Sequence, residues 1–161
     1  MNIRWLINEG KMFFGDSVVD CVCHVRNEEN GERVLASKPV ISENSDGSEG
    51  VPYMPRRFPM GKWNVTVILP KTDPYEAPEF IATDAHQTVE RWRTRIGRDG
   101  NEIYDQPSGD MVEDYGYGLH NSTSSTTLGC GRIIETADRD LLARTIRQSW
   151  ESKEPVTLEI T

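Results

Sequence analysis

The chain has 161 residues, with 36% hydrophobic and 27% charged residues, which is typical of one globular domain with its own core. The formal net charge of −8 argues against nucleic-acid binding, because binding to phosphates needs a basic face. No segment has the long apolar run of a transmembrane helix, and Met1 to Phe14 lacks the pattern of a signal peptide. We expect a single domain over 1–161 without a membrane segment. Its localisation stays open between the cytoplasm, export without a cleaved leader, and a leader missing from this chain.

The first half predicts short strands, because apolar residues alternate weakly and turn signals recur at regular intervals. Asn30-Gly31 is typical of a hairpin turn. The polar, Gly-rich segment 42–50 and the Pro-bounded segment 70–78 predict loops. The strands that we expect are Met12–Val25 (one or two strands), Glu32–Ala36, Trp63–Leu69 and Glu79–Ala82.

The second half predicts two helices. Thr83 or Asp84 can cap a helix that runs to Ile96. After a polar loop over Gly97–Gly109, Tyr115–Leu119 predicts a strand that leads to His120. The second helix is expected over Thr136–Trp150, where apolar residues recur at helical spacing, and a last strand over Val156–Ile160. The predicted fold is mainly β with two helices, in the α+β class.

Two of the three cysteines, Cys21 and Cys23, lie two positions apart in a predicted strand, so both should point to the same face. This spacing disfavours a disulfide between them, and a zinc site would need more ligands than the neighbouring His24. We therefore expect them to be packing residues and expect no metal or other cofactor.

The segment with the clearest chemistry is 115–133, in which His120 and Cys130 are joined by small polar residues. A thiolate is the reactive form of cysteine, and a nearby imidazole can take the thiol proton. Backbone N–H groups around Gly129 and Gly131 are candidates for an oxyanion hole, and Arg132 for binding a carboxylate. On spacing alone, a chance pair on a flexible loop, with Arg132 as a surface charge, is the better interpretation of these residues.

These residues resemble the signature of the L,D-transpeptidase (YkuD-type) family. In that family a strand ends in a histidine, and a Gly-Cys pair follows, with an arginine two residues after the cysteine. The matching residues are His120, Gly129, Cys130 and Arg132. The predicted helix and last strand follow in the family's order, and Pro59-Met-Gly61 resembles its Pro-x-Gly turn. The resemblance covers residues 58–161 with gaps.

The sequence departs from the family pattern at two points. The family's second histidine, just before the Gly-Cys pair, is absent, and Leu128 stands next to Gly129 instead. The segment between His120 and Cys130 is also short for the family.

The resemblance implies a β-sandwich or partly open barrel and a cysteine transferase or hydrolase that acts on the cell wall. Cys130 would attack a stem-peptide carbonyl in peptidoglycan, and His120 would transfer the proton. Tyr117, expected on the strand face of His120, and Asn121 could line the substrate pocket or serve as scaffold. Such an enzyme would act in the periplasm or outside the cell and could have an immunity or delivery protein as partner. A non-catalytic domain of the same fold and a cysteine hydrolase of another peptide remain alternatives.

Two weaker candidates lie outside this segment. His86 fits a surface histidine better than a catalytic one. Glu113 and Asp114 form an acidic pair of the kind that glycosidases use, but nothing else in the sequence supports that activity.

Overall fold

The computed structural model describes residues 1–23, 57–70, 79–90, 98–100, 109–121 and 130–161 with their side chains. Backbone strands alone are described at 28–29, 32–33, 40–41, 52–53, 91–96 and 102–108. The predicted loop over 42–50 lies outside the described residues, as does the loop predicted over 70–78 except for Pro70, which ends a strand.

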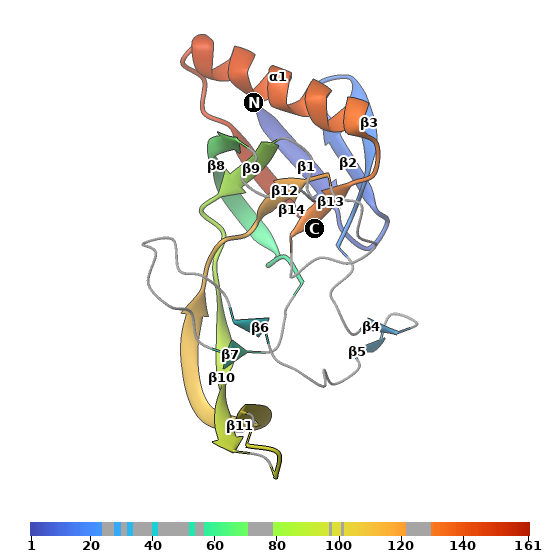
Figure 1. Ribbon diagram of the computed structural model, residues 1–161. Helices are drawn as coiled ribbons and strands as arrows, with labels where there is room; N and C mark the ends of the chain where they lie inside the picture. Colours follow the sequence, from blue (N-terminus) through green and yellow to red (C-terminus); the bar gives the residue numbers. More distant parts are fainter. Residues whose placement is uncertain are drawn as a thin grey trace.

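Eight strands form a closed barrel (Figure 1). Two neighbouring pairs, β1–β14 and β12–β13, are parallel, and the other neighbours are antiparallel. In order around the barrel the strands are β1 (Asn2–Leu6), β14 (Thr157–Ile160), β8 (Gly61–Pro70), β9 (Glu79–Thr83), β12 (Gly118–His120), β13 (Gly131–Ile133), β3 (Ser17–Val22) and β2 (Lys11–Phe14).

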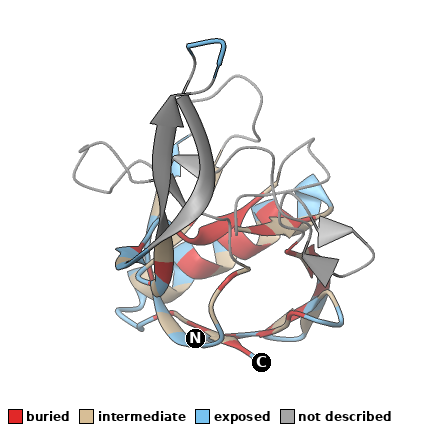
Figure 2. Cartoon of the chain, turned by 90° about the horizontal axis from the view of Figure 1, so that it is seen from below, coloured by how far each residue is buried: buried red, intermediate tan, exposed pale blue. Residues whose placement is uncertain are grey.

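The barrel strands follow the period of two that the pleat imposes. In β1, Ile3 and Trp5 are buried while their neighbours Asn2 and Arg4 are exposed. The indole N–H of Trp5 donates to the Cys21 carbonyl oxygen at 2.9 Å, which satisfies its one polar group inside the core. Figure 2 shows the buried residues along the barrel strands and on one face of the helix.

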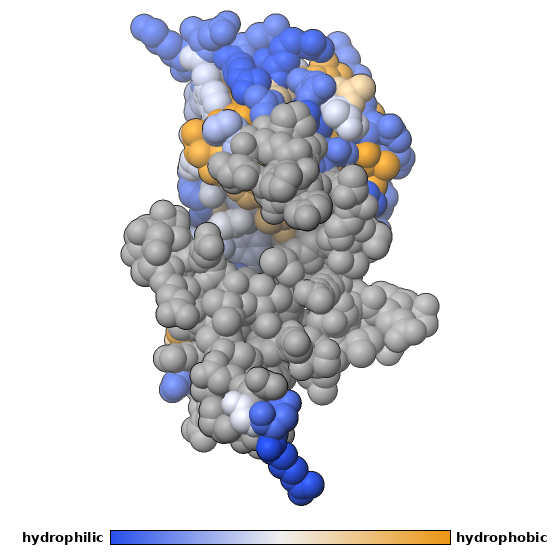
Figure 3. Space-filling view, viewed as in Figure 1, coloured by the Kyte–Doolittle hydropathy of each residue, from blue (hydrophilic) through white to orange (hydrophobic). Residues whose placement is uncertain are grey.

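The helix predicted over 136–150 is confirmed as α1 (Thr136–Glu151), which lies across one end of the barrel (Figure 1). It buries Leu142, Ala143 and Ile146. The fully buried Arg139 reaches Glu79 of β9 at 3.4 Å and Asp140 at 2.5 Å, so its charge is paired. On the face in Figure 3, hydrophilic side chains dominate over α1 and hydrophobic ones form small patches.

The helix predicted from Thr83 or Asp84 to Ile96 is wrong. Residues Gln87–Ile96 form strand β10, which pairs with β11 (Glu102–Asp114) in a long antiparallel hairpin that extends away from the barrel (Figure 1). The predicted loop over 97–109 is likewise wrong from Glu102 onward. Arginine alternates with Trp92, Thr94 and Ile96, and this period of two favours a strand. The structure follows this period and not the helix-capping signal at Thr83 or Asp84.

Short strands complete the β-structure. The hairpin sheet has the order β11-β10-β7-β6, with β7 at Pro52–Tyr53 and β6 at Val40–Ile41. The hairpin predicted around Asn30-Gly31 is confirmed by the antiparallel pairing of β4 (Glu28–Glu29) with β5 (Glu32–Arg33). The strands predicted within Met12–Val25, Trp63–Leu69, Glu79–Ala82 and Val156–Ile160 are confirmed as β2 and β3, β8, β9 and β14.

The mainly β, α+β prediction is confirmed, but the described part of the chain contains one helix and not two. The expected sandwich or partly open barrel is replaced by a closed barrel, because β1 pairs with both β2 and β14. Within the described residues, no helix combines the length and the apolar character needed to cross a bilayer.

Candidate functional site

The candidate site is built on the parallel strands β12 and β13. Leu119 pairs with Gly131 and His120 pairs with Arg132. Leu119 and Ile133 point into the core and are fully buried, so His120 and Arg132 lie on the opposite, outer face. The pairing thus brings two of the predicted site residues side by side.

Cys130 directly precedes β13, one residue before the paired Gly131. Parallel strands lie about 4.8 Å apart and two residues of strand span about 6.6 Å, so the Cα atoms of Cys130 and His120 are about 8 Å apart. The thiol is half-buried and donates to the Gly116 carbonyl oxygen at a Sγ–O distance of 3.7 Å. Gly116 precedes β12, so it lies on the side of Cys130 away from His120.

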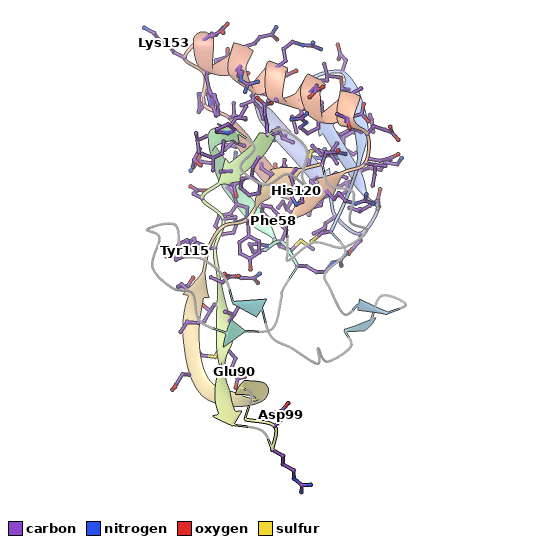
Figure 4. The ribbon with its side chains drawn as sticks, in the orientation of Figure 1. Phe58, Glu90, Asp99, Tyr115, His120 and Lys153 are labelled. Atoms are coloured by element: carbon purple, nitrogen blue, oxygen red, sulfur yellow. The ribbon has the colours of Figure 1, made fainter. Side chains whose placement is uncertain are left out.

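His120 is 7% exposed, although it lies on the outer face of its strand. Its imidazole lies against the ring of Phe80 on the neighbouring strand β9, with 6.0 Å between ring centroids. Figure 4 labels His120 on β12, on the side of the barrel where the two parallel strands lie.

Gly118 keeps the outer face flat beside Cys130. A Cβ atom at this position would meet the ring of Phe80 and would lie 2.5 Å from the Ile81 carbonyl oxygen. The Phe80 ring therefore occupies the space that a side chain at 118 would fill, and forms an apolar wall next to His120.

Asn121 is a structural clamp in this arrangement. Its Nδ2 donates to the carbonyl oxygens of Ile133 at 2.7 Å and Ile134 at 3.0 Å. Its Oδ1 accepts from the Thr136 hydroxyl at 3.1 Å. These bonds tie the end of β12 to the end of β13 and to the start of α1, so the side chain is committed to the scaffold and not to a ligand.

Tyr117 does not share the strand face of His120, because it precedes β12 and stands three residues away. It is a buried core residue, with 5.4 Å between its ring centroid and that of Phe58. Its hydroxyl donates to Asp114 Oδ2 at 2.6 Å and accepts from Gln87 Nε2 at 2.6 Å. This network gives Tyr117 and the buried Asp114 a scaffold role.

Of the two glycines beside Cys130, the structure describes only Gly131. A Cβ on Gly131 would lie 2.6 Å from Leu119 and 2.9 Å from Trp5, so close core packing is reason enough for a glycine there. Gly129, the other candidate for an oxyanion hole, lies outside the described residues.

Cys21 and Cys23 are both buried, which confirms that they share the inner face. Burial raises the pKa of the Cys21 thiol well above its ordinary value, Cys23 raises this pKa further, and the positive charge of Arg132 opposes the rise. Inside the core this thiol is protonated and unreactive. In the parts of the chain that are described with side chains, no three His, Cys, Asp or Glu residues gather as metal ligands.

His86 is a surface histidine, as expected, but it stands before a strand and not at a helix start. Its Nδ1 lies 2.9 Å from Glu113 Oε2, and Glu113 also accepts a hydrogen bond from the Thr88 hydroxyl. These two bonds, the one from Thr88 first, lower the pKa of Glu113. Glu113 is thus exposed and charged while Asp114 is buried, so the two side chains do not face a common substrate.

Sequence reasoning missed Phe80 and the glycines at 116 and 118. The glycines were visible in the Tyr-Gly-Tyr-Gly pattern before Leu119. The sequence does not reveal that Phe80 contacts His120, because this contact depends on the pairing of β9 with β12 in the barrel.

Comparison with known proteins adds no family assignment: no family model matches the chain, and no similar curated protein or solved structure is found.

Proposed function

We propose that the protein is a cysteine-dependent L,D-transpeptidase or L,D-carboxypeptidase that acts on peptidoglycan stem peptides, with Cys130 as nucleophile and His120 as acid and base. The observation that carries the proposal is the parallel pairing of β12 with β13. It sets the histidine and the segment after the cysteine on adjacent strands, in the order that the family resemblance implies. Helix α1 and strand β14, which follow β13, support the same resemblance.

The reaction has two steps. His120 takes the Cys130 proton, and the thiolate attacks a peptide carbonyl beside a D-configured centre. The peptide C–N bond breaks, the leaving amine takes the proton from His120, and an acyl-thioester remains. Water then releases a carboxylic acid, or a second amine forms a new peptide bond, and either route restores the thiol.

A substrate bound at Cys130 would contact the apolar ring of Phe80 and the positive charge of Arg132. Arg132 fits the carboxylate of a stem peptide, because a guanidinium binds carboxylates through paired hydrogen bonds. An enzyme of this kind acts on the cell wall, so we expect it in the periplasm or outside the cell, with an immunity or delivery protein as its partner.

Cys130→Ala tests the proposal. We expect the purified variant to lose at least about 10³-fold in turnover of tetrapeptide muropeptides, because the nucleophile is removed. Its circular dichroism and melting temperature should stay close to wild type, since Cys130 lies outside the core. Product masses separate hydrolysis from cross-linking, and equal turnover by the variant would overturn the assignment.

Thiol labelling gives a second readout, provided the right reference is used. Cys21 and Cys23 are buried and would label slowly whatever Cys130 does. The informative reference is a small free thiol such as glutathione. We expect Cys130 to react faster than this reference near neutral pH and to lose the advantage in His120→Ala. A rate equal to the reference in both proteins would favour the non-catalytic alternative.

A further inference from the structure

A cluster of aromatic side chains lies on the surface where the β10–β11 hairpin joins the barrel. We call Trp63, His86 and Tyr115 the aromatic cluster. The His86 ring centroid is 5.4 Å from that of Trp63, at 64° between planes, and 5.4 Å from that of Tyr115, at 31°. The three residues come from β8, the segment before β10 and the segment after β11.

Two rings of the aromatic cluster are exposed and yet held in place, and the third, Trp63, is partly buried against the core. Tyr115 is 51% exposed, and the His86 side chain is 47% exposed. The Trp63 indole N–H donates to the Pro59 carbonyl oxygen at 3.0 Å, and Glu113 holds the His86 ring at 2.9 Å. Figure 4 shows Tyr115 at the base of the hairpin with its side chain directed away from the barrel. Rings that are fixed and half open to water are ready to bind without further ordering.

The chemistry of the cluster fits a neutral sugar. The C–H face of a pyranose ring packs on aromatic faces, and its hydroxyls donate to carboxylates. Glu113, 43% exposed and with two bonded neighbours, keeps lone pairs for such donors. A phosphate or a polyanionic chain fits poorly, because the net charge is −8 and the carboxylate at the cluster is ionised.

The aromatic cluster is also close to the thiol along the chain. Gly116, whose carbonyl oxygen accepts from Cys130 at 3.7 Å, directly follows Tyr115. A ligand on the cluster and a peptide at the thiol would therefore contact consecutive residues of one segment.

We propose that the aromatic cluster, together with Glu113, binds the chain of N-acetylated amino sugars that carries the stem peptides. The choice of this sugar rests on the proposed function, whereas the affinity for a neutral saccharide rests on the cluster alone.

Tetra-N-acetylchitotetraose is the probe. We titrate it into the full chain carrying Cys130→Ala and follow backbone amide shifts by NMR. We expect shifts centred on residues 86 and 115, with a Kd on the order of 1 mM. Tyr115→Ala should weaken binding at least tenfold and Tyr115→Phe should retain it. Met111→Ala, an exposed change on the hairpin, is the matched control and should leave binding unchanged.

The outcomes separate this proposal from the function of the thiol. Sugar binding without muropeptide turnover by the wild type would support the sugar site and contradict the proposed enzymatic activity. Turnover without binding at 10 mM probe, or binding that Tyr115→Ala does not weaken while the variant is folded, would overturn the site. Self-association in sedimentation that Tyr115→Ala abolishes, with no sugar binding, would make the cluster a protein interface and also overturn it.

Discussion

The barrel and the β10–β11 hairpin are both β-structure, but different forces hold them. In the barrel, inward residues from eight strands pack with α1 into one cluster of buried side chains. In the described part of the hairpin, Val89 is the buried hydrophobic residue, and it lies outside that cluster. The hairpin is held instead by its antiparallel ladder and by the Gln87–Tyr117–Asp114 network at its base. The core therefore fixes the candidate catalytic strands, and the base of the hairpin, the part described with side chains, adds surface beside them.

Removing residues 157–160 should show the difference most strongly. These residues form β14, which pairs with β1 on one side and β8 on the other, and which buries Leu158 and Ile160. We expect the truncated chain to lose its cooperative thermal transition, because the barrel opens and the core is exposed. The control variant replaces residues 91–110 by Asn-Gly, which joins Glu90 to its paired residue Met111. Its melting temperature should stay within several degrees of wild type. A folded truncated chain, or an unfolded control, would reverse our comparison of the two regions.

Gly118→Ala is expected to have the next largest effect. The added methyl group would meet backbone at the Ile81 carbonyl oxygen, at 2.5 Å, and strands β9 and β12 would have to part. Overpacking of this kind costs about 1–3 kcal/mol in the free energy of unfolding. Urea denaturation measures it. Gly109→Asn in the hairpin is the control, because that glycine has φ of 79° with open space around it, and asparagine tolerates this conformation. Equal costs at both positions would contradict the expected contrast.

Asn121→Ala should cost about 1–2 kcal/mol of unfolding free energy, because it removes the donor for two carbonyl oxygens at the end of β13. Thr136→Ala removes the single bond to Asn121 Oδ1 and should cost less. Chemical denaturation of both variants gives the comparison. Asn121→Asp, which keeps the shape and loses the donor, should resemble the alanine variant. If it behaves like wild type instead, the clamp does not work through these bonds.

The smallest effect is expected at Glu113, at the base of the hairpin. Its pKa is lowered by hydrogen bonds from Thr88 and His86, so the folded state favours the carboxylate. The associated stability is complete above the unfolded pKa of about 4.3 and is lost as the pH falls through the lowered folded pKa. An NMR titration should show that Thr88→Val raises the Glu113 pKa, and that His86→Ala, which removes the second hydrogen bond, raises it too. An unchanged value in Thr88→Val would remove the hydroxyl as the main cause.

The sequence predicted the barrel strands where one face is buried. The apolar period of two survives in Val156–Ile160, and α1 shows the helical period equally well. In β8 a bulge between Val65 and Val67 breaks the period, so Val67 and Leu69 are exposed although the strand itself was predicted. No strand was predicted for β1, although its Ile3 and Trp5 alternate with polar residues. The helix predicted to Ile96 was wrong because the local capping signal at Thr83 or Asp84 favours a helix, whereas the chain follows the period of two in which arginines alternate with Trp92, Thr94 and Ile96.

The site was predictable only in part, for a physical reason. His120 and Cys130 could be chosen from the chemistry of their side chains. The neighbours that shape their surroundings, Phe80 and Gly116, depend on which strands meet around the barrel, and no local pattern encodes that. For Asn121 and Tyr117 the sequence left a pocket role and a scaffold role open, and their hydrogen bonds favour the scaffold role.

The parallel pairing of β1 with β14 joins residues such as Ile3 and Leu158, which are 155 positions apart. While the chain is being synthesised, β1 has no partner on this side until the segment after α1 has left the ribosome. Contacts of such long range also slow folding after release. The thiol-bearing segment is made earlier but is not fixed in a closed barrel until then. If the chain crosses an export channel unfolded, the barrel has to form again after translocation. Any activity that needs the closed barrel would then begin where the chain refolds.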